Sequence, residues 1–264
     1  MTTNVNEHDK IVNISVSGWS GSGATSLALI LSELFGYHYF HLGGVYRHLG
    51  MKLGHSEEGF NRPKFDDYIE PIIGETTDRY RDYKLMEGER VLADSDLGTF
   101  IIGKHPKVYS IFLKSEFEER VKKVIKDERE DALTVLKERD NINQQFYINM
   151  HGVDVFDEEL IDRKFNFVLD NTHVSLEEEV RLVMENLKTI THFKNAFDFA
   201  QIDKHVDEEV EEFAKIGKDC YKDRLLKKKL ILTPEKIIQE IAQTLPEDLA
   251  EFPENIQNIF LGRD

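Results

Sequence analysis

Cysteine is almost absent from the sequence, since Cys220 is alone among 264 residues. An internal disulfide needs two cysteines and a cysteine-based zinc site needs more, so the chain contains neither. No motif surrounds Cys220, which is interpreted as an ordinary helix residue. The scarcity of cysteine agrees with a reducing compartment.

Long apolar runs are also missing. No stretch approaches the roughly 18 to 20 consecutive apolar residues that a membrane-spanning helix needs. The first ten residues, MTTNVNEHDK, lack the basic start and apolar stretch of a secretory signal. We therefore expect a cytoplasmic location and no membrane partner.

Positive charge is in short supply. Lys and Arg total 34 against 50 Asp and Glu, which gives a formal net charge of −16 at pH 7. A surface of that sign repels phosphate polymers, so we expect no nucleic-acid partner. A small anionic ligand must then be held by donors that are placed locally.

A glycine-rich segment, SGWSGSGATSL at residues 17–27, is the most informative motif. It follows a β-branched stretch, KIVNISVSG, whose apolar positions Ile11, Ile14 and Val16 are expected to be buried. It precedes TSLALILSELF, which has helical spacing and ends at Gly36. Strand, glycine loop and helix in this order are typical of a phosphate-binding loop, in which backbone N–H groups and a helix N-terminus hold an anion.

Ala24 stands where the phosphate-loop pattern G-x-x-x-x-G-K-[ST] has its lysine. Thr25, or Ser26 beside it, keeps the hydroxyl that the pattern places on Mg²⁺. The loop residues that we expect to contact nucleotide phosphate are Gly18, Gly21, Ser22, Gly23, Ala24, Thr25 and Ser26. What the loop lacks is the charge that would follow phosphate into the transition state. The alternative is that these glycines merely form a tight turn.

Four further β-rich stretches follow the loop. They are YHYFHLGG, ERVLADSDLG, KVYSIFLKS and KFNFVLDNT, at residues 37–44, 89–98, 107–115 and 164–172. Helical stretches separate them, and this alternation predicts an α/β fold with a parallel sheet and helices on both faces. Residues 55–88, with Pro63 and Pro71, are expected to form short helices of an insertion.

From about residue 190 the pattern is helical throughout. DEEVEEFAKIGKDCYKDRLLKKKL and TPEKIIQEIAQTL have helical periodicity, and Thr233 followed by Pro234 predicts a helix start. The basic run KDRLLKKK is interpreted as a solvated helix face. We predict a helical C-terminal extension over residues 190–264, which is a candidate surface for self-association or a protein partner.

Residues 11 to about 188 resemble the cytidylate kinases, particularly the archaeal-type branch of that nucleoside monophosphate kinase family. The resemblance rests on ISVSGWSGSGATSLALILSELFGYHYFHLGGVYR, RVLADSDLG, VYSIFLKSEFEERVKKV, LKERDN…Y…HGVDV and FNFVLDNTHVSLEEEV, in that order. It implies a three-layer P-loop NTPase fold with a five-stranded sheet. It also implies a kinase-like domain over residues 1–189, with an acceptor-binding insertion at 48–88 and a water-excluding lid at 139–157.

The resemblance implies roles for individual residues. Arg47 would bind the acceptor's phosphate, and Gly43 and Gly44 would let the end of the second strand approach that nucleotide. Asp94 would make a water-mediated contact to Mg²⁺, with Thr25 as the other metal-binding residue; the alternative for Asp94 is a turn residue at a strand end. The implied cofactors are ATP and Mg²⁺, and the implied partners are nucleotides.

The chain also departs from the family in positive charge. Asp96 stands where members usually have an arginine two residues after the carboxylate. In the lid, Arg139 matches and would stabilise the transferring phosphoryl group, but Asn141 and Phe146 stand at other arginine places. Because phosphoryl transfer depends on positioning and on neutralising charge, these losses bear directly on activity. Three nearby basic residues are candidates to replace the missing charge: Lys104, Arg120 and Lys123.

Three histidines, His38, His41 and His48, lie near the second predicted strand. They have no carboxylate in ligand spacing, and scattered histidines of this kind are in most cases ordinary surface or core residues. We assign them no role.

Two functions follow from these patterns. The first is ATP-dependent phosphorylation of CMP, dCMP or a related monophosphate. The alternative is a catalytically impaired nucleotide-binding or scaffold protein, a pseudokinase that uses the fold and its C-terminal helices to bind a partner.

Overall fold

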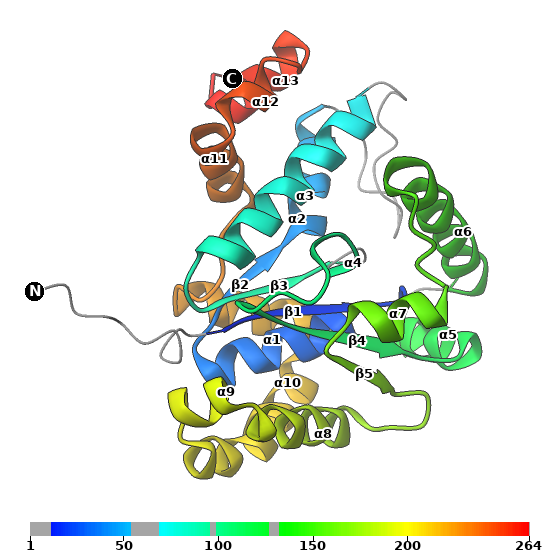
Figure 1. Ribbon diagram of the computed structural model, residues 1–264, viewed down its shortest axis with the longest axis vertical. Coiled ribbons are helices and arrows are strands. Elements are labelled where there is room, and N and C mark those ends of the chain that lie inside the picture. The colour runs from blue at the N-terminus through cyan, green and yellow to red at the C-terminus, as the bar shows by residue number, and fades with distance from the viewer. Residues whose placement is uncertain (1–11, 54–68, 96–98, 127–131, 264) are drawn as a thin grey trace, which may run out of the picture.

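A five-stranded parallel sheet forms the centre of the molecule (Figure 1). The computed structural model describes residues 12–53, 69–95, 99–126 and 132–263. The strands lie in the order β2-β3-β1-β4-β5. Their bounds are β1 Asn13–Gly18, β2 His38–His41, β3 Val91–Asp94, β4 Val108–Lys114 and β5 Phe167–Asp170. The predicted α/β class, the parallel sheet and the five strands are confirmed.

Four helices cover one face of the sheet: α1 (Ala24–Phe35), α8 (Leu176–Thr189), α9 (Thr191–Ala196) and α10 (Phe199–Lys227). They share one apolar core with the strands. Ile14 and Val16 of β1 are fully buried in it, as predicted, and Tyr39 of β2 joins them. Ile11, also predicted to be buried, lies outside the described residues. The strands of a parallel sheet carry apolar side chains on both faces, so helices must cover both faces to keep those side chains away from solvent.

The other face carries the remaining helices. They are α2 (Leu42–Lys52), α3 (Ile69–Glu87), α4 (Thr99–Ile102), α5 (Phe117–Lys126), α6 (Ala132–His151), α7 (Glu158–Lys164), α11 (Pro234–Thr244), α12 (Pro246–Leu249) and α13 (Glu254–Leu261). Phe40 and Ala93 point into the core that α2, α3 and α11 share with the sheet. The group α5, α6 and α7 lies towards β4 and β5 (Figure 1). Helices on both faces make three layers.

Helix ends follow the local sequence. Side-chain oxygens cap the starts of α7, α8, α10 and α11, from Asp157, Ser175, Asp198 and Thr233 respectively. The predicted start at Thr233 is therefore confirmed, as is the end of α1 at Gly36, whose φ is 66°. The start of α1 differs, because Gly23 offers no side-chain cap. Its first N–H groups thus have no side-chain acceptor and no intrahelical acceptor.

Two local predictions are wrong. The strand predicted over residues 37–44 ends at His41, and Gly43 and Gly44 lie in the first turn of α2. A Cβ on Gly43 would lie 2.9 Å from His41 Nε2, so glycine there makes room for the imidazole. The role of Gly43 and Gly44 beside an acceptor nucleotide stays a prediction. Residues 69–87 form one 19-residue helix and not several short ones. Pro71 lies within the described part of this helix; Pro63 lies outside the described residues.

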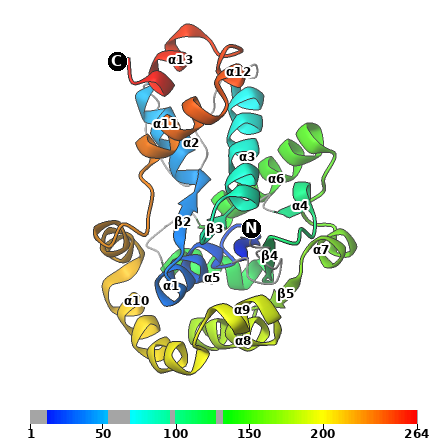
Figure 2. The same ribbon diagram turned by 60° about the vertical axis from the view of Figure 1, so that its left-hand side comes forward.

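The C-terminal helices wrap the edge of the sheet at β2. α10 packs against α1 and α8, and the link after it runs along β2, where the Tyr39 N–H donates to Leu230 O at 2.7 Å. α11 then packs against α2 and α3 (Figure 2). The apolar faces of α10 and α11 thus complete the chain's own cores. The domain boundary at residue 190 and a partner surface over 190–264 stay predictions.

The structure also bears on the single cysteine and on the lack of long apolar runs. Cys220 is exposed on α10 and forms no disulfide. Within the described ranges, no helix combines the length and the apolar character needed to cross a membrane. The cytoplasmic location stays a prediction.

Candidate functional site

The glycine-rich loop joins β1 to α1 at the carboxyl end of the sheet. Gly18 has no room for a side chain, since a Cβ there would lie 2.4 Å from Ser22 Oγ. Gly21 and Gly23 have φ values of 81° and 104°, a backbone region that glycine adopts without strain. The Ser22 N–H closes the turn by donating to Trp19 O at 2.8 Å. The loop therefore leads into an uncapped helix start, which is the geometry of an anion site.

Four side chains from four elements form one hydrogen-bonded chain beside the loop. Thr25 Oγ1 donates to Asp94 Oδ2 at 2.7 Å, and His41 Nδ1 lies 2.5 Å from Asp94 Oδ1. Arg47 NH2 lies 3.1 Å from His41 Nε2. A guanidinium only donates, so Nε2 accepts and the imidazole proton lies on Nδ1, where it is donated to Asp94. We call this side of the loop, with Thr25, Asp94, His41 and Arg47, its inner side.

Asp94 is a buried carboxylate, 5% exposed. Burial by itself would raise its pKa, but the contact with His41 and the hydrogen bond from Thr25 outweigh burial and hold the pKa of Asp94 below its usual value. Burial, reinforced by the charge of Asp94, raises the pKa of Tyr39 well above that of an ordinary phenol. The inner side thus holds an ionised carboxylate next to the start of α1.

The structure brings together some of the predicted site residues. Thr25 and Asp94 are in direct contact, and Arg47, exposed on α2, reaches them through His41. The Ala24 side chain packs against the core around α1. Asp96 lies outside the described residues. Ser26 is half-buried in the first turn of α1.

The two proposed substitute cations on α5 contact backbone carbonyls of the loop. Arg120 NH1 donates to Ser20 O at 2.9 Å, and Lys123 Nζ lies 3.2 Å from Ser22 O. Asn171 Nδ2 donates to the same Ser22 oxygen at 2.8 Å. In an anion-binding loop the backbone N–H groups point towards the ligand and the carbonyl groups point away from it. Basic side chains that contact the carbonyl oxygens therefore lie on the side of the loop away from the bound anion. We call the side with Arg120, Lys123 and Asn171 the outer side; these residues position the loop.

The third proposed substitute, Lys104, is exposed just after α4. The described contacts of Lys104, Arg120 and Lys123 do not place any of these residues on the inner side of the loop. The prediction that nearby elements replace the loop lysine therefore gains no support from these three residues.

The segment predicted as a lid is docked onto the loop. Trp19 Nε1 donates to Val155 O at 2.9 Å, and the Trp19 ring stacks on Phe156 with centroids 5.5 Å apart. Arg120 joins the loop to α6 through a two-bond pair with Asp140, at 3.0 and 2.8 Å. Tryptophan in this loop is thus explained by its contact with the segment after α6.

The lid positions that depart from the family lie on α6. Arg139 is half-buried and Asn141 is exposed. Phe146 packs against α3, because a Cβ added to Gly74 of that helix would lie 3.2 Å from its ring. An apolar contact between α6 and α3 stands where the family resemblance implies an arginine.

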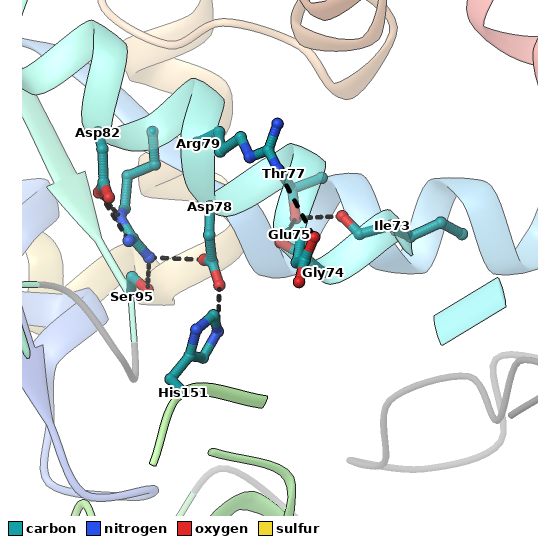
Figure 3. Close-up of polar contacts among 10 residues, drawn as sticks. Ile73, Gly74, Glu75, Thr77, Asp78, Arg79, Asp82, Ser95 and His151 are labelled. Carbon is teal, nitrogen blue, oxygen red and sulfur yellow. Dashed lines mark hydrogen bonds and ion pairs between the residues drawn. The ribbon is translucent and has the colours of Figure 1, made fainter. Parts of the chain in front are cut away.

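Arg81, fully buried on α3, is a cation that the sequence patterns did not single out. Figure 3 labels the residues around it, Asp78, Asp82, Ser95 and His151. The Arg81 guanidinium bonds to Asp78 at 2.6 Å, to Asp82 at 2.7 Å and to Ser95 Oγ at 3.1 Å. His151, at the end of α6, lies 3.5 Å from the other Asp78 oxygen. Two carboxylates neutralise Arg81, so this cluster ties α3 and α6 to the end of β3 and does not offer a free charge to a ligand.

His41 is the inner-side residue that sequence reasoning missed. It was assigned no role, yet it links Asp94 to Arg47. The strand pattern alone did not reveal it, because the pairing of His41 with Asp94 follows from the register of two neighbouring parallel strands. Carboxyl ends of such strands meet at the edge of the sheet where ligands bind in α/β folds.

An open hollow of about 610 Å³ adjoins the outer side of the loop, between α5 and the segment that joins β5 to α8. Its lining residues are Glu119, Lys122, Lys123, Ile125, Thr172, His173, Val174 and Ser175. Lys123 therefore touches both the hollow and the loop.

Residues 13–173 match the family model described as the cytidylate kinase-like family. The chain belongs to that family. The resemblance predicted from the loop and strand motifs is therefore confirmed. The match includes the loop, the inner side and the predicted lid, and it ends before α8, so the cytidylate kinase-like part of the chain is followed by helices that the family model does not include.

Curated relatives of this cytidylate kinase-like chain come from archaea. The cytidylate kinase of Pyrobaculum islandicum is 27% identical over 194 residues, which cover 72% of this chain and 100% of that protein. That of Pyrobaculum aerophilum is 29% identical over 189 residues, covering 70% and 97%. These relatives support a nucleoside monophosphate kinase-like function.

A solved structure shares the fold. It is the crystal structure of an uncharacterized protein from Eubacterium ventriosum, with a TM-score of 0.50 and 14% identity, covering 68% of this chain and 99% of that one. At this identity the likeness shows the fold alone.

Proposed function

We propose that this chain is an ATP-dependent nucleoside monophosphate kinase that phosphorylates CMP, dCMP or a related monophosphate with Mg²⁺. The observation that carries the proposal is the hydrogen bond between Thr25 and Asp94 at the uncapped start of α1. In P-loop NTPases a loop hydroxyl and a strand-end aspartate are the pair that holds Mg²⁺. When bound, Mg²⁺ supplies a charge that neutralises the donor phosphates. Family membership supports the reaction class.

The chain's own residues have distinct tasks in this proposal. The N–H groups at the start of α1 bind the donor phosphates. Arg47 binds the acceptor's phosphate, and His41 orients the guanidinium by accepting one of its N–H groups. Asp94 stays ionised because of its contacts with His41 and Thr25. α6 and the residues after it cover the loop and exclude water, which favours transfer to the acceptor over hydrolysis.

We place the nucleoside of the donor in the hollow beside α5. A volume of about 610 Å³ is within the range of sites for small organic ligands. Lys123 lines it and also contacts Ser22 O, so a nucleoside there lies next to the loop that would hold its phosphates.

A second candidate function, a nucleotide-binding or scaffold protein without turnover, is favoured by one observation. Phe146 fills a contact between α6 and α3 at a place where the family resemblance implies an arginine. Transfer without that charge has a higher barrier, since phosphoryl transfer depends on neutralising the transferred group.

Turnover of a panel of monophosphates separates the two candidates. We expect ADP formation from ATP and Mg²⁺ that depends on CMP or a related acceptor. Arg47→Ala should lower kcat/KM by about 100-fold, because a charge-assisted bond to the acceptor's phosphate is lost. Arg163→Ala, an exposed arginine on α7, is the matched control and should leave the rate unchanged.

If ADP formation does not depend on an acceptor even at high protein concentration, the kinase proposal is wrong. In that case thermal unfolding with CMP and with ATP decides what remains. A ligand that binds only the folded state raises the midpoint, so a rise indicates a binding protein and no rise an empty site.

A further inference from the structure

Trp19 is the only tryptophan of the chain, and it stands in the glycine-rich loop. It takes the first of the four positions that the pattern G-x-x-x-x-G-K-[ST] leaves free, so neither phosphate binding nor metal binding demands an indole there. No sequence pattern assigns Trp19 a role. A large aromatic ring in a loop that must approach a ligand closely therefore calls for a reason of its own.

The side chain of Trp19 is half-buried against the predicted lid. Its Nε1 donates to Val155 O at 2.9 Å, and its ring stacks on Phe156 with an angle of 28° between the two planes. The hydrogen bond fixes the direction of the indole, and the stacked ring adds apolar contact. Phe112 of β4 also meets the indole, edge-on at 83°. The indole thus joins the sheet to the residues that follow α6.

The backbone of Trp19 belongs to the turn of the loop itself. Trp19 O accepts the Ser22 N–H at 2.8 Å, which closes that turn. The next residue is tied to α6 as well, since Asn143 Nδ2 donates to Ser20 Oγ at 3.3 Å and both side chains are buried. A shift of the loop backbone at residues 19 and 20 therefore changes the contacts of the loop with α6 and with the residues after it.

Phosphate binding and these contacts favour each other. Phosphates at the start of α1 accept hydrogen bonds from backbone N–H groups, and such bonds fix the backbone of the loop. A fixed loop presents the indole in one position, which favours one position of Val155 and Phe156. Coupling between two sites is reciprocal, so residues docked on the indole favour the bound phosphates in turn.

We propose that Trp19 couples phosphate binding in the loop to docking of the predicted lid, so that the lid covers the loop most firmly when a nucleotide is bound. The inference rests on the proposed function, because it assumes that the loop takes nucleotide phosphates. Trp19 acts here as a positioning residue, since its side chain contacts the lid and not the reacting atoms.

The chemical effect of this coupling is on water. With the lid undocked, a water oxygen attacks the γ-phosphorus of ATP and the bond from that phosphorus to the oxygen of ADP breaks. The products are ADP and inorganic phosphate, and a proton goes to the solvent. With the lid docked, water is excluded and an oxygen of the acceptor's phosphate attacks instead.

Acrylamide quenching of Trp19 fluorescence measures the docking, because no other tryptophan contributes to the emission. A non-hydrolysable ATP analogue with Mg²⁺ should lower the quenching constant of wild type by about twofold or more, because the bound ligand shifts the lid towards its docked position. Phe156→Ala removes the stacked ring and leaves the loop unchanged, so the analogue should no longer lower the quenching constant.

Phe165→Leu is the matched control for these measurements. Phe165 lies in the same apolar core as Trp19 and packs on Phe100 and Phe112. A smaller side chain there leaves a cavity and lowers the unfolding midpoint. The response of Trp19 quenching to the analogue should nevertheless equal that of wild type.

Turnover gives a second measurement, the rate of phosphate release divided by the rate of transfer to CMP. Trp19→Leu loses the hydrogen bond and the stacked ring, so this ratio should rise by about tenfold or more. Trp19→Phe keeps a ring for Phe156 and loses only the donor, so the ratio should rise by about threefold. Phe165→Leu should leave the ratio unchanged.

The outcomes separate the inference from the proposed function. If calorimetry shows that wild type binds the analogue but its quenching does not fall, the inference is wrong and the proposed function stands. If quenching still falls in Phe156→Ala, the nucleotide itself shields the indole and the inference is wrong. The same holds if Trp19→Leu and Phe165→Leu change the ratio equally, because Trp19 then acts through stability alone.

The remaining outcomes concern wild type without turnover. If wild type binds the analogue and phosphorylates no acceptor, the kinase proposal is wrong, and quenching of wild type and Phe156→Ala decides the inference by itself. If wild type binds no nucleotide, the proposed function fails and the inference with it.

Discussion

On its inner side the loop meets Thr25 and the Asp94–His41 pair, whereas on its outer side it meets Arg120, Lys123 and Asn171. The outer cations contact carbonyl oxygens of the protein, and Arg120 is also matched by Asp140. The inner side holds an ionised carboxylate, with Arg47 joined to it through His41. The contrast shows that a count of basic residues near a phosphate loop says little until their contacts are known. The cations on the outer side hold the loop, and in our proposal the charges on the inner side serve the phosphates of the nucleotides.

The largest effect expected from the outer side is on stability. Arg120→Met removes a buried pair with Asp140 and hydrogen bonds to Ser20 O and Ser115 O. Removing one partner of a buried pair leaves the other uncompensated, so the free energy of unfolding should fall by about 3 to 5 kcal/mol. Urea unfolding followed by circular dichroism measures it.

Lys122→Met is the control for Arg120→Met, because Lys122 is exposed on the same helix and pairs only with a neighbour one turn away. Its free energy of unfolding should change by less than about 0.5 kcal/mol. If Arg120→Met and Lys122→Met had the same free energy of unfolding, Arg120 would not hold the loop as we describe, and the distinction between the two sides of the loop would be lost.

A smaller effect concerns pH. Glu179 of α8 accepts a 2.5 Å hydrogen bond from Asn171, which in turn holds Ser22 O. Burial raises the pKa of Glu179 from 4.5 to about 7, although the bond from Asn171 and the charge of Lys123 oppose it. The folded state therefore holds this proton more tightly than the unfolded state. Its contribution to stability is complete below about pH 4.5 and is lost as the pH rises through about 7, by about 3 kcal/mol in all.

Glu179→Gln tests this dependence. Glutamine keeps the acceptor for Asn171 and cannot ionise, so the variant should be more stable than wild type at pH 8 and nearly equal to it at pH 5. The difference between the two unfolding free energies, measured in urea from pH 5 to pH 8, should grow steadily over this range. Parallel curves would show that burial does not raise the pKa of Glu179.

The sequence predicts the parts of this molecule that depend on neighbours along the chain. The β-branched run around Ile14 and Val16, the glycines of the loop and the cap at Thr233 each determine their own local conformation, and each is found as expected. The boundary after His41 was misjudged, because Gly43 and Gly44 resemble the end of a strand until the place of the imidazole is known.

The contacts that give the site its charge were out of reach of the sequence. His41 gains its place from the register between β2 and β3, and Arg81 from the packing of α3 on the end of β3. Such placements depend on how distant elements pack, which local patterns do not encode.

The most direct test of the inner side as the reacting side is the turnover of Asp94→Asn. Asparagine keeps the shape and can still accept from Thr25, but it removes the charge that would serve Mg²⁺ and puts an amide NH2 where a carboxylate oxygen accepts from His41. We predict that CMP-dependent ADP formation falls by about 100-fold or more while the unfolding free energy changes little relative to that loss. Turnover of Asp94→Asn equal to that of wild type would contradict the account.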